Sequence, residues 1–476
     1  NMIVDFSIPL INKDKITDLQ NETNFIDPYM NKTDSTIFSN GQTLTKAYTY
    51  NSELFFKHKF PNKKSYFTAS VAYLNNFTHS ERSFISLTQI GDSNLNNEDY
   101  YTDGSQDYDI LTSNLDFTFP LFTCDVNAGF KTSFTNTSSN NSFSQINLIG
   151  ASVTNKYNYS ENIQALYYSM EKTISDWSFK IGIRSELTGS IGNSLSLNEK
   201  YEDNYINFFP SLFVSNRIND KSNISFSYAN RIERAPYQYL DPFKWYISKY
   251  DYAMGNPFLK PSYIRIIELK YYASTFSAKL YHTGQEDIIG RYVVLDSLDM
   301  MNQVQKTDNF LNMNSFGINI FKYLKYKKLE TVLQGNVSYN QYLSNRKEFS
   351  DISGVNGTFI MMNTILLNEK FQILCNIEEK IPGLYYYRTM KNYFKLDIGF
   401  NFIHSKKGFE ARLLVSDIFK TANPEYSYIS GGVNQVYKNY HDTRMLRFVL
   451  TWRLGNWFNK TSNIPSPSNI EEKQRL

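Results

Sequence analysis

Apolar and polar residues alternate with a period of two in one segment after another along this chain of 476 residues. The clearest example is the segment 446–454, in which one face carries Leu446, Phe448, Leu450, Trp452 and Leu454. The intervening positions carry Arg447, Val449, Thr451 and Arg453. Segments 177–186, 224–231 and 394–402 follow the same pattern. Because successive side chains of a β-strand point to opposite faces, the sequence predicts strands with one apolar and one water-compatible face.

Two kinds of all-β architecture accommodate such strands. A β-sandwich or soluble barrel turns the apolar face inward, whereas a transmembrane barrel turns it outward against lipid. Charged residues recur on the polar faces, and aromatic residues, 16% of the chain, gather near strand ends as they do in the girdles at membrane interfaces. The chain has no run of about 18 apolar residues, which argues against a transmembrane helix. The sequence therefore favours a transmembrane antiparallel β-barrel.

The lengths of the predicted connections alternate between short and long. Short connections are expected near 62–64, 273–275, 368–370 and 405–408. Long connections are expected near 26–45, 80–106, 135–153, 235–257 and 419–439. Outer-membrane barrels have short periplasmic turns and longer extracellular loops, so the alternation also assigns the two ends of the barrel.

About 19 strands are predicted. The first, Ile3–Leu10, is expected to end at a short periplasmic turn, and the last, ending near Trp457, runs the same way. That arrangement needs an odd number of strands, whereas a closed single-chain barrel of this kind has an even number. We therefore expect residues 1–458 to form a barrel domain that lacks strands at its N-terminal side, followed by a periplasmic tail, 459–476.

Charge and motifs exclude several other classes of function. The net charge of +3 is too small to indicate a nucleic-acid partner, and no nucleophile elbow, phosphate-binding loop or dinucleotide fingerprint occurs. Cys124 and Cys375 are expected to be unpaired, and the five histidines are scattered without metal-ligand spacing. The sequence therefore predicts a protein that is not an enzyme and that has neither cofactor nor metal.

One stretch, residues 230–261, is richer in aromatic residues, prolines and charges than a simple hairpin connection requires. Its prolines stiffen the chain, and its aromatic side chains are large contact groups with polar tips. The candidate ligand-binding residues of this predicted extracellular loop are Arg231, Arg234, Tyr237, Tyr239, Trp245, Tyr246, Tyr250 and Tyr252. They contact either a ligand or partner, or only the barrel rim.

The same stretch carries a family resemblance. Arg231-Ile232-Glu233-Arg234-Ala235-Pro236-Tyr237 is followed by Leu240-Asp241-Pro242-Phe243, Gly255-Asn256-Pro257-Phe258-Leu259-Lys260-Pro261 and Glu268-Leu269-Lys270-Tyr271. This series resembles the TonB-dependent receptor-like outer-membrane β-barrels of Bacteroidetes. It departs from the family pattern by an inserted Ala235 and by Asp241 in place of the usual asparagine. Segments 177–186 and 208–215 and the end of the chain resemble the family as well.

The resemblance implies a location in the bacterial outer membrane and a barrel of about 22 strands behind a plug and a TonB box. It implies import of an unidentified ligand, with TonB acting through an N-terminal plug region missing from this chain. The alternative is a scaffold of a surface complex that does not transport. The expected partners are membrane lipid, TonB, and a surface lipoprotein or a missing N-terminal chain. Lumen-facing arginines (Arg184, Arg231, Arg447 and Arg453) either pair with a plug or anionic ligand or are hydrated.

Overall fold

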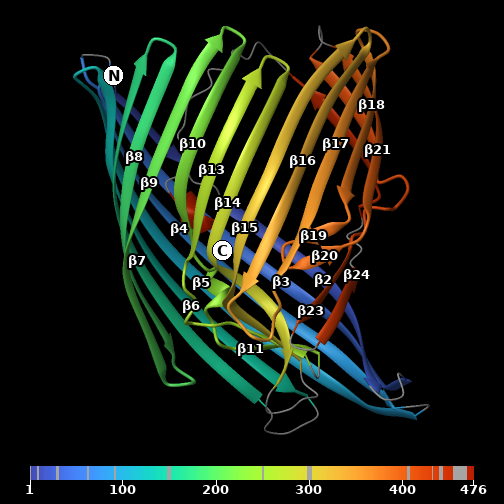
Figure 1. Cartoon of the computed structure of the whole chain (residues 1–476). Coiled ribbons are helices and arrows are strands. Elements are labelled where there is room, and N and C mark those ends of the chain that lie inside the picture. Colours follow the sequence, from blue (N-terminus) through green and yellow to red (C-terminus); the bar gives the residue numbers. More distant parts are fainter. Residues whose placement is uncertain are drawn as a thin grey trace.

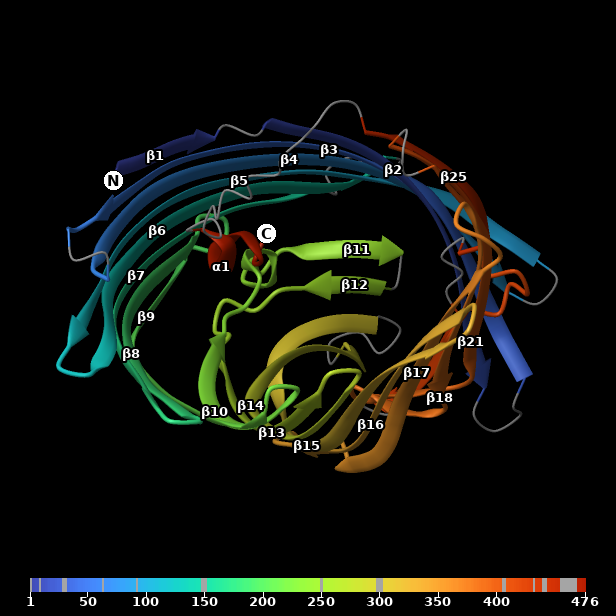
Figure 2. The ribbon, with the colours of Figure 1, turned by 90° about the horizontal axis from the view of Figure 1, so that it is seen from above.

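The computed structural model describes residues 2–7, 10–27, 32–61, 64–90, 93–146, 152–248, 251–296, 303–404, 408–430, 433–438, 443–453 and 469–476. These residues are almost entirely β-strands, which form an oval wall around a lumen (Figures 1 and 2). The described residues contain no helix that is both long and apolar enough to cross a membrane. The fold is the antiparallel β-barrel that the alternation predicted.

The wall is built from strands that pair antiparallel with their neighbours in chain order, except that β1 and β2 both pair with β3. The wall strands are β1 (Met2–Ser7), β2 (Leu10–Asp27), β3 (Lys32–Lys59), β4 (Tyr66–Ile90), β5 (Ser93–Leu121), β6 (Cys124–Gln145), β7 (Ser152–Ile174), β8 (Trp177–Ser194), β9 (Glu199–Asn219), β10 (Ser222–Glu233), β13 (Ser262–Ala273), β14 (Phe276–Leu295), β15 (Gln303–Tyr326), β16 (Leu329–Ser344), β17 (Ile352–Leu366), β18 (Phe371–Ile381), β21 (Tyr393–His404), β22 (Phe409–Ser416) and β25 (Met445–Trp452). Among the described residues no ladder joins β25 to β1 or β2.

The first strand runs opposite to the predicted direction. Both β1 and β2 pair with β3, from Met2 opposite His58 to Asp27 opposite Lys32, so together they make one wall strand. The 21-stranded sheet counts them separately and includes two further strands inside the lumen, which leaves 18 wall strands in the described residues. The number is even rather than odd, because the segment expected to turn after Leu10 instead continues along β3.

Several predicted loops are strands. Most of 26–45, 80–106 and 135–153 belongs to β2 to β6, and β5 alone is 29 residues long. A transmembrane strand needs only about 9–11 residues, so these hairpins continue far beyond a bilayer. Their Ser-, Thr- and Asn-rich sequence lacks apolar alternation because no lipid surrounds that part of the wall. The tight turns at 273–275 and 368–370 are confirmed, whereas residues 62–63 and 405–407 lie outside the described part.

The outward face of the wall is apolar and exposed. On β25, Leu450 is 56% and Trp452 is 65% exposed, and both lie opposite apolar or small residues of β22. On β8, the exposed Ile181 and Ile183 alternate with Lys180 and the inward-facing Arg184. These strands have the apolar outer face that the alternation predicted, and the contact of this face with lipid stays a prediction.

A layer of strands crosses the lumen inside the wall. It consists of β11 (Lys244–Ser248), β12 (Asp251–Met254) and the adjoining ends of β15 and β14. The first two form a hairpin, and β12 runs parallel to β15 with Asp251 opposite Gln303. A bulge in β14 near Asp287, which has a φ of 53°, marks the irregularity where this end of the β14–β15 hairpin departs from the regular ladder. Figure 2 shows β11 and β12 lying across the barrel interior.

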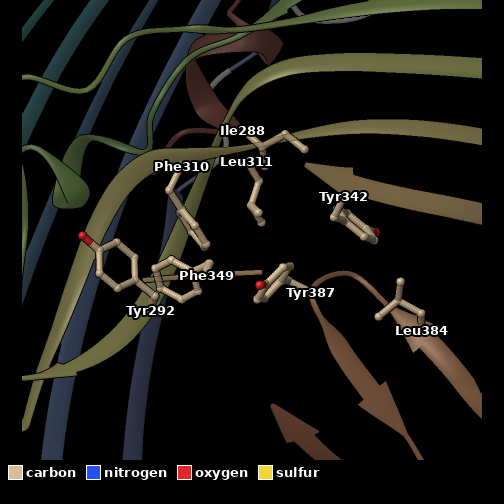
Figure 3. Close-up of a cluster of buried hydrophobic side chains, with 8 residues drawn as sticks. All are labelled: Ile288, Tyr292, Phe310, Leu311, Tyr342, Phe349, Leu384 and Tyr387. Atoms are coloured by element: carbon tan, nitrogen blue, oxygen red, sulfur yellow. The ribbon is translucent and has the colours of Figure 1, made fainter. Parts of the chain in front are cut away.

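A hydrophobic cluster packs beside this inner layer (Figure 3). It joins the β14–β15 hairpin to β16, to the connection after β16, and to the small sheet formed by β19 (Gly383–Tyr385), β20 (Arg388–Met390), β23 (Glu425–Ser430) and β24 (Val433–Lys438). Its buried members are Ile288, Tyr292, Phe310, Leu311, Tyr342, Phe349, Leu384 and Tyr387. The inner layer therefore has a hydrophobic support of its own.

Candidate functional site in the barrel lumen

The aromatic stretch that follows β10 turns inward and is anchored on the wall by Asp241. The Asp241 carboxylate accepts hydrogen bonds from Ser139, from Asn141 Nδ2 at 2.8 Å and from Asn155 Nδ2 at 2.9 Å, and also from the Phe243 backbone N–H at 3.0 Å. Burial raises the pKa of Asp241, and these donors partly offset that effect. Four donors converge on position 241, so a short side chain that can accept hydrogen bonds is needed there. This requirement explains the short polar residue at this position of the family pattern.

The Gly255-Asn256 pair, near the end of the aromatic stretch, packs against Tyr239 and Asp241 near its start. A Cβ on Gly255 would lie 2.3 Å from the Asp241 carbonyl oxygen and 2.6 Å from that of Tyr239, so only glycine fits without moving the backbone. The Asn256 N–H donates to the Tyr239 carbonyl at 2.7 Å. The two halves of the motif thus hold one another across the intervening hairpin.

Tyr237, in the short helix η1 (Tyr237–Tyr239), is 3% exposed. Its ring packs against Tyr108 and Tyr159, at centroid distances of 5.8 and 6.1 Å, in a cluster with Leu74 and Ile110 of the wall. The inward face of the wall is therefore not purely polar, because apolar side chains collect where the inner segments dock.

The other predicted aromatic residues also pack within the lumen. Tyr246 stacks on Phe143 at 4.0 Å, Trp245 meets Phe243 edge-on at 5.4 Å, and the Tyr252 hydroxyl donates to Asp296 at 2.6 Å. Tyr239 lies 4.3 Å from the Arg291 guanidinium. These contacts support the packing alternative, and a role in ligand binding stays a prediction. Tyr250 lies outside the described residues.

The two predicted arginines differ in their partners. Arg234 donates to Glu186 at 2.8 Å and to Thr188 at 2.9 Å, and its Nε contacts the Tyr205 hydroxyl at 3.1 Å. Arg231 faces the lumen from β10 and has no hydrogen bond or ion pair within the described residues. Only Arg234 is therefore fixed by ion pairing.

Sequence reasoning missed the contribution of residues 469–476. This segment contains the short helix α1 (Ile470–Lys473) and lies inside the lumen against the wall (Figure 2). The buried Lys131 of β6 contacts Glu471 at 2.6 Å and Glu472 at 3.0 Å, and Asn469 donates to Asn51 of β3 at 2.8 Å. The sequence placed this segment in a periplasmic tail, and the division of the chain at residue 458 stays a prediction.

Arg475 links this segment to the aromatic stretch. Its Nη1 lies 2.5 Å from Glu161 of β7, its Nε donates to the Ala235 carbonyl at 3.0 Å, and its guanidinium lies 4.1 Å from the Tyr237 ring centroid. Burial, the largest single influence, disfavours the charge on Arg475, but Glu161, Tyr237 and Tyr159 together outweigh it and hold the pKa of Arg475 well above its usual value. The side chain therefore remains a buried, paired cation.

Two cavities meet at the arginines. The outer cavity, about 500 Å³, is lined by wall residues Tyr157, Lys200 and Tyr201 and by the chain around Phe258. The inner cavity, about 690 Å³, is lined by Arg184, Arg231 and Glu471 among others. Arg234 and Arg475 line both. The ion pairs of these two side chains thus form the partition between the cavities.

A separate polar group lies on the outward face of β4 and β5. His79 Nε2 is 3.1 Å from Glu81 and 3.6 Å from Asp103, and the three side chains have mutual distances that would suit a metal ion. Glu81 and Asp103 are directly opposed across the ladder, where like charges repel. His79 is within hydrogen-bonding distance of Glu81, and all three side chains are partly exposed.

The sequence matches the Outer membrane protein beta-barrel family over residues 58–452, most of the chain. The chain belongs to this family. Its location is accordingly the bacterial outer membrane. A comparison with curated protein sequences found no match.

Solved structures of outer-membrane receptors are similar to the chain at low identity. The siderophore receptor PirA from Pseudomonas aeruginosa is 11% identical, over 86% of this chain and 78% of that one, with a TM-score of 0.47. The ferric yersiniabactin uptake receptor FyuA from Yersinia pestis is 10% identical over 90% and 73%, with a TM-score of 0.48. The ferric-catecholate import receptor Fiu from Escherichia coli K12 is 10% identical over 94% and 80%, with a TM-score of 0.49.

Proposed function

We propose that the chain is the barrel of an outer-membrane receptor that imports a ligand through a gated lumen. The observation that carries the proposal is the pair of cavities separated by Arg234 and Arg475. At this level, buried ion pairs to Glu186 and Glu161 tie the inner segments to the wall. Ion pairs and hydrogen bonds can exchange partners, so such a connection between the inner segments and the wall suits a passage that opens on demand.

The outer cavity is the proposed point of ligand entry. It lies toward the end of the barrel that carries the extended hairpins, and it presents aromatic rings beside charged groups. Aromatic residues and arginine commonly dominate binding energy, and a binding cavity of this volume is of ordinary size for a small ligand. In this proposal TonB supplies energy through a plug region outside these residues, as the resemblance of the 231–271 stretch implies.

A scaffold without transport is the second candidate. It is favoured by the close packing of Tyr237 and Tyr246 on the wall, which buries the Tyr237 ring and part of the Tyr246 ring. A scaffold needs only the outer surface and the extended hairpins. Its lumen would stay closed under all conditions.

Solute entry into intact cells separates the two candidates. Cells that express the full-length protein would be compared with a deletion strain, with and without TonB, for uptake of fluorescent solutes of graded size and charge. Transport predicts protein-dependent uptake of at least one solute that is lost without TonB. Equal uptake in all strains, together with intact recovery of a surface complex, would support the scaffold instead.

A further inference from the structure

We propose that the inner wall around Lys131 and Glu161 is a peptide-binding site, and that residues 469–476 are its detachable occupant. The occupied site is a plug made from the chain's own tail. Its release joins the two cavities. This consequence rests on the proposed transport function, whereas the binding itself does not.

The segment is held mainly by charge and hydrogen bonding. Lys131 contacts two adjacent carboxylates, Glu471 and Glu472, and Arg475 contacts Glu161 through two nitrogens. Within the segment, Ile470 is exposed, and Leu476 is its partly buried apolar contact with the wall cluster. A segment bound in this way is exchangeable, because water or another charged partner can replace each of its contacts.

The segment cannot hold its conformation alone. Its helix has four residues, well below the length at which an isolated helix is stable in water. The ordered form is therefore imposed by the wall, and release returns the segment to a disordered state with a gain in conformational entropy. The balance between this entropy and the ion pairs sets the fraction of time that the site is occupied.

Release changes the partition between the cavities. Arg475 lines both cavities, and it also covers the Tyr237 ring and accepts the Tyr237 N–H through its carbonyl at 3.2 Å. Its departure removes one of the two arginines from the partition and uncovers the aromatic stretch. Arg234 stays in place through Glu186 on the wall. Opening thus requires movement of the tail and not of the wall.

The site also defines the chemistry of a competing partner. The occupant offers two adjacent carboxylates and, three residues after the second, an arginine. These groups match Lys131 and Glu161, which lie on neighbouring strands of a rigid wall. A free peptide with the sequence NIEEKQRL should therefore compete with the tethered segment.

A spin label at position 473 reports occupancy directly. Lys473 is exposed on the docked segment, so K473C is labelled in full-length protein whose Cys124 and Cys375 are serine. K131E should repel both carboxylates and lower the docked population by more than about tenfold, a factor equal to ~1.4 kcal/mol. Adding E471K and E472K to K131E should restore the immobile spectrum. K325E breaks the exposed Lys325–Glu330 pair and serves as the matched control with no effect.

The binding site, its exchangeability, the joining of the cavities and the transport function are each contradicted by a different result. A label that is equally immobile in wild type, K131E and E161Q, each confirmed as folded by heat modifiability, would overturn the binding site. Failure of excess NIEEKQRL peptide to mobilise the label would overturn its exchangeability. If K131E frees the label without raising solute permeability, the proposed joining of the cavities is wrong. A freed label with no TonB-dependent uptake in any strain would instead contradict the transport function alone.

Discussion

Asp251 lies on the inner hairpin with a buried carboxylate oxygen that has no hydrogen-bond partner within the described residues. Burial raises the pKa of Asp251 to about 6, against an opposing effect of the Arg82 cation from β4. A carboxyl whose pKa is raised on folding stabilises the docked state below its unfolded pKa. That contribution is lost as the pH rises through the folded pKa. The inner hairpin should therefore be docked more firmly at pH 5 than at pH 8.

The expected difference between pH 5 and pH 8 is about 1 kcal/mol, because only about one unit of the pKa shift is lost between these two pH values and the group is partly exposed. Native-state hydrogen exchange of the β11 and β12 amides, corrected for intrinsic rates, measures it. D251N keeps the shape of the side chain without the titration and should flatten the pH dependence of these amides. Equal protection at both pH values in the unmodified protein would show that the Asp251 carboxyl does not control docking.

At the scale of the element, the hairpin β11–β12 tests the two interpretations of the aromatic stretch. Trp245 and Tyr246 are half-buried against the rings of Phe243 and Phe143, so packing should be their main role. The double substitution W245A/Y246A should weaken docking of the hairpin by roughly 2–4 kcal/mol, since truncation of fully buried aromatic residues costs about 3–5 kcal/mol each. Limited proteolysis between β11 and β12 measures this loss.

Phe258 provides the matched control for that substitution. It belongs to the same stretch but is 72% exposed, and F258A should leave the proteolysis rate unchanged. If W245A/Y246A leaves hairpin docking intact and instead abolishes ligand uptake, the rings serve recognition and the packing interpretation fails.

The alternating pattern located elements only where a membrane imposes it. Residues 177–186 and 446–452 lie in strands with the predicted faces, because lipid requires an apolar outer surface there. Beyond the bilayer, β5 continues through Asn97, Asp103 and Gly104, and the sequence there shows no alternation of apolar and polar residues that would predict a strand. A ladder of backbone hydrogen bonds needs a neighbouring strand but no particular pattern of side chains.

The candidate site was predictable only in part, for a related reason. Arg234 and Tyr237 were selected from local composition, and both contribute to the luminal packing that the structure shows. Arg475 was missed, since its partner Glu161 lies 314 residues away and the intervening sequence gives no sign of the contact. In the sequence alone, a polar segment with two carboxylates and an arginine is indistinguishable from a solvated terminus. Its partners on the wall are identified only in the folded structure.

At the scale of the whole molecule, the barrel places lipid and water on opposite sides of a single strand. On β25, Leu450 lies opposite Ala411 of β22 and Thr451 lies opposite Glu410, so neighbouring residues belong to opposite faces. Spin labels at L450C and T451C, in a background whose two native cysteines are serine, should therefore report oxygen-accessible lipid and aqueous surroundings respectively. The reason is energetic, because a lysine or arginine on the lipid side near mid-membrane would cost about 2–4 kcal/mol, whereas the lumen side tolerates charge. The pair I181C and K180C on β8 provides the matched comparison, with Ile181 outward and Lys180 inward. A reversed pattern on both strands would mean that the apolar faces enclose the interior, and the membrane-barrel assignment would then be wrong.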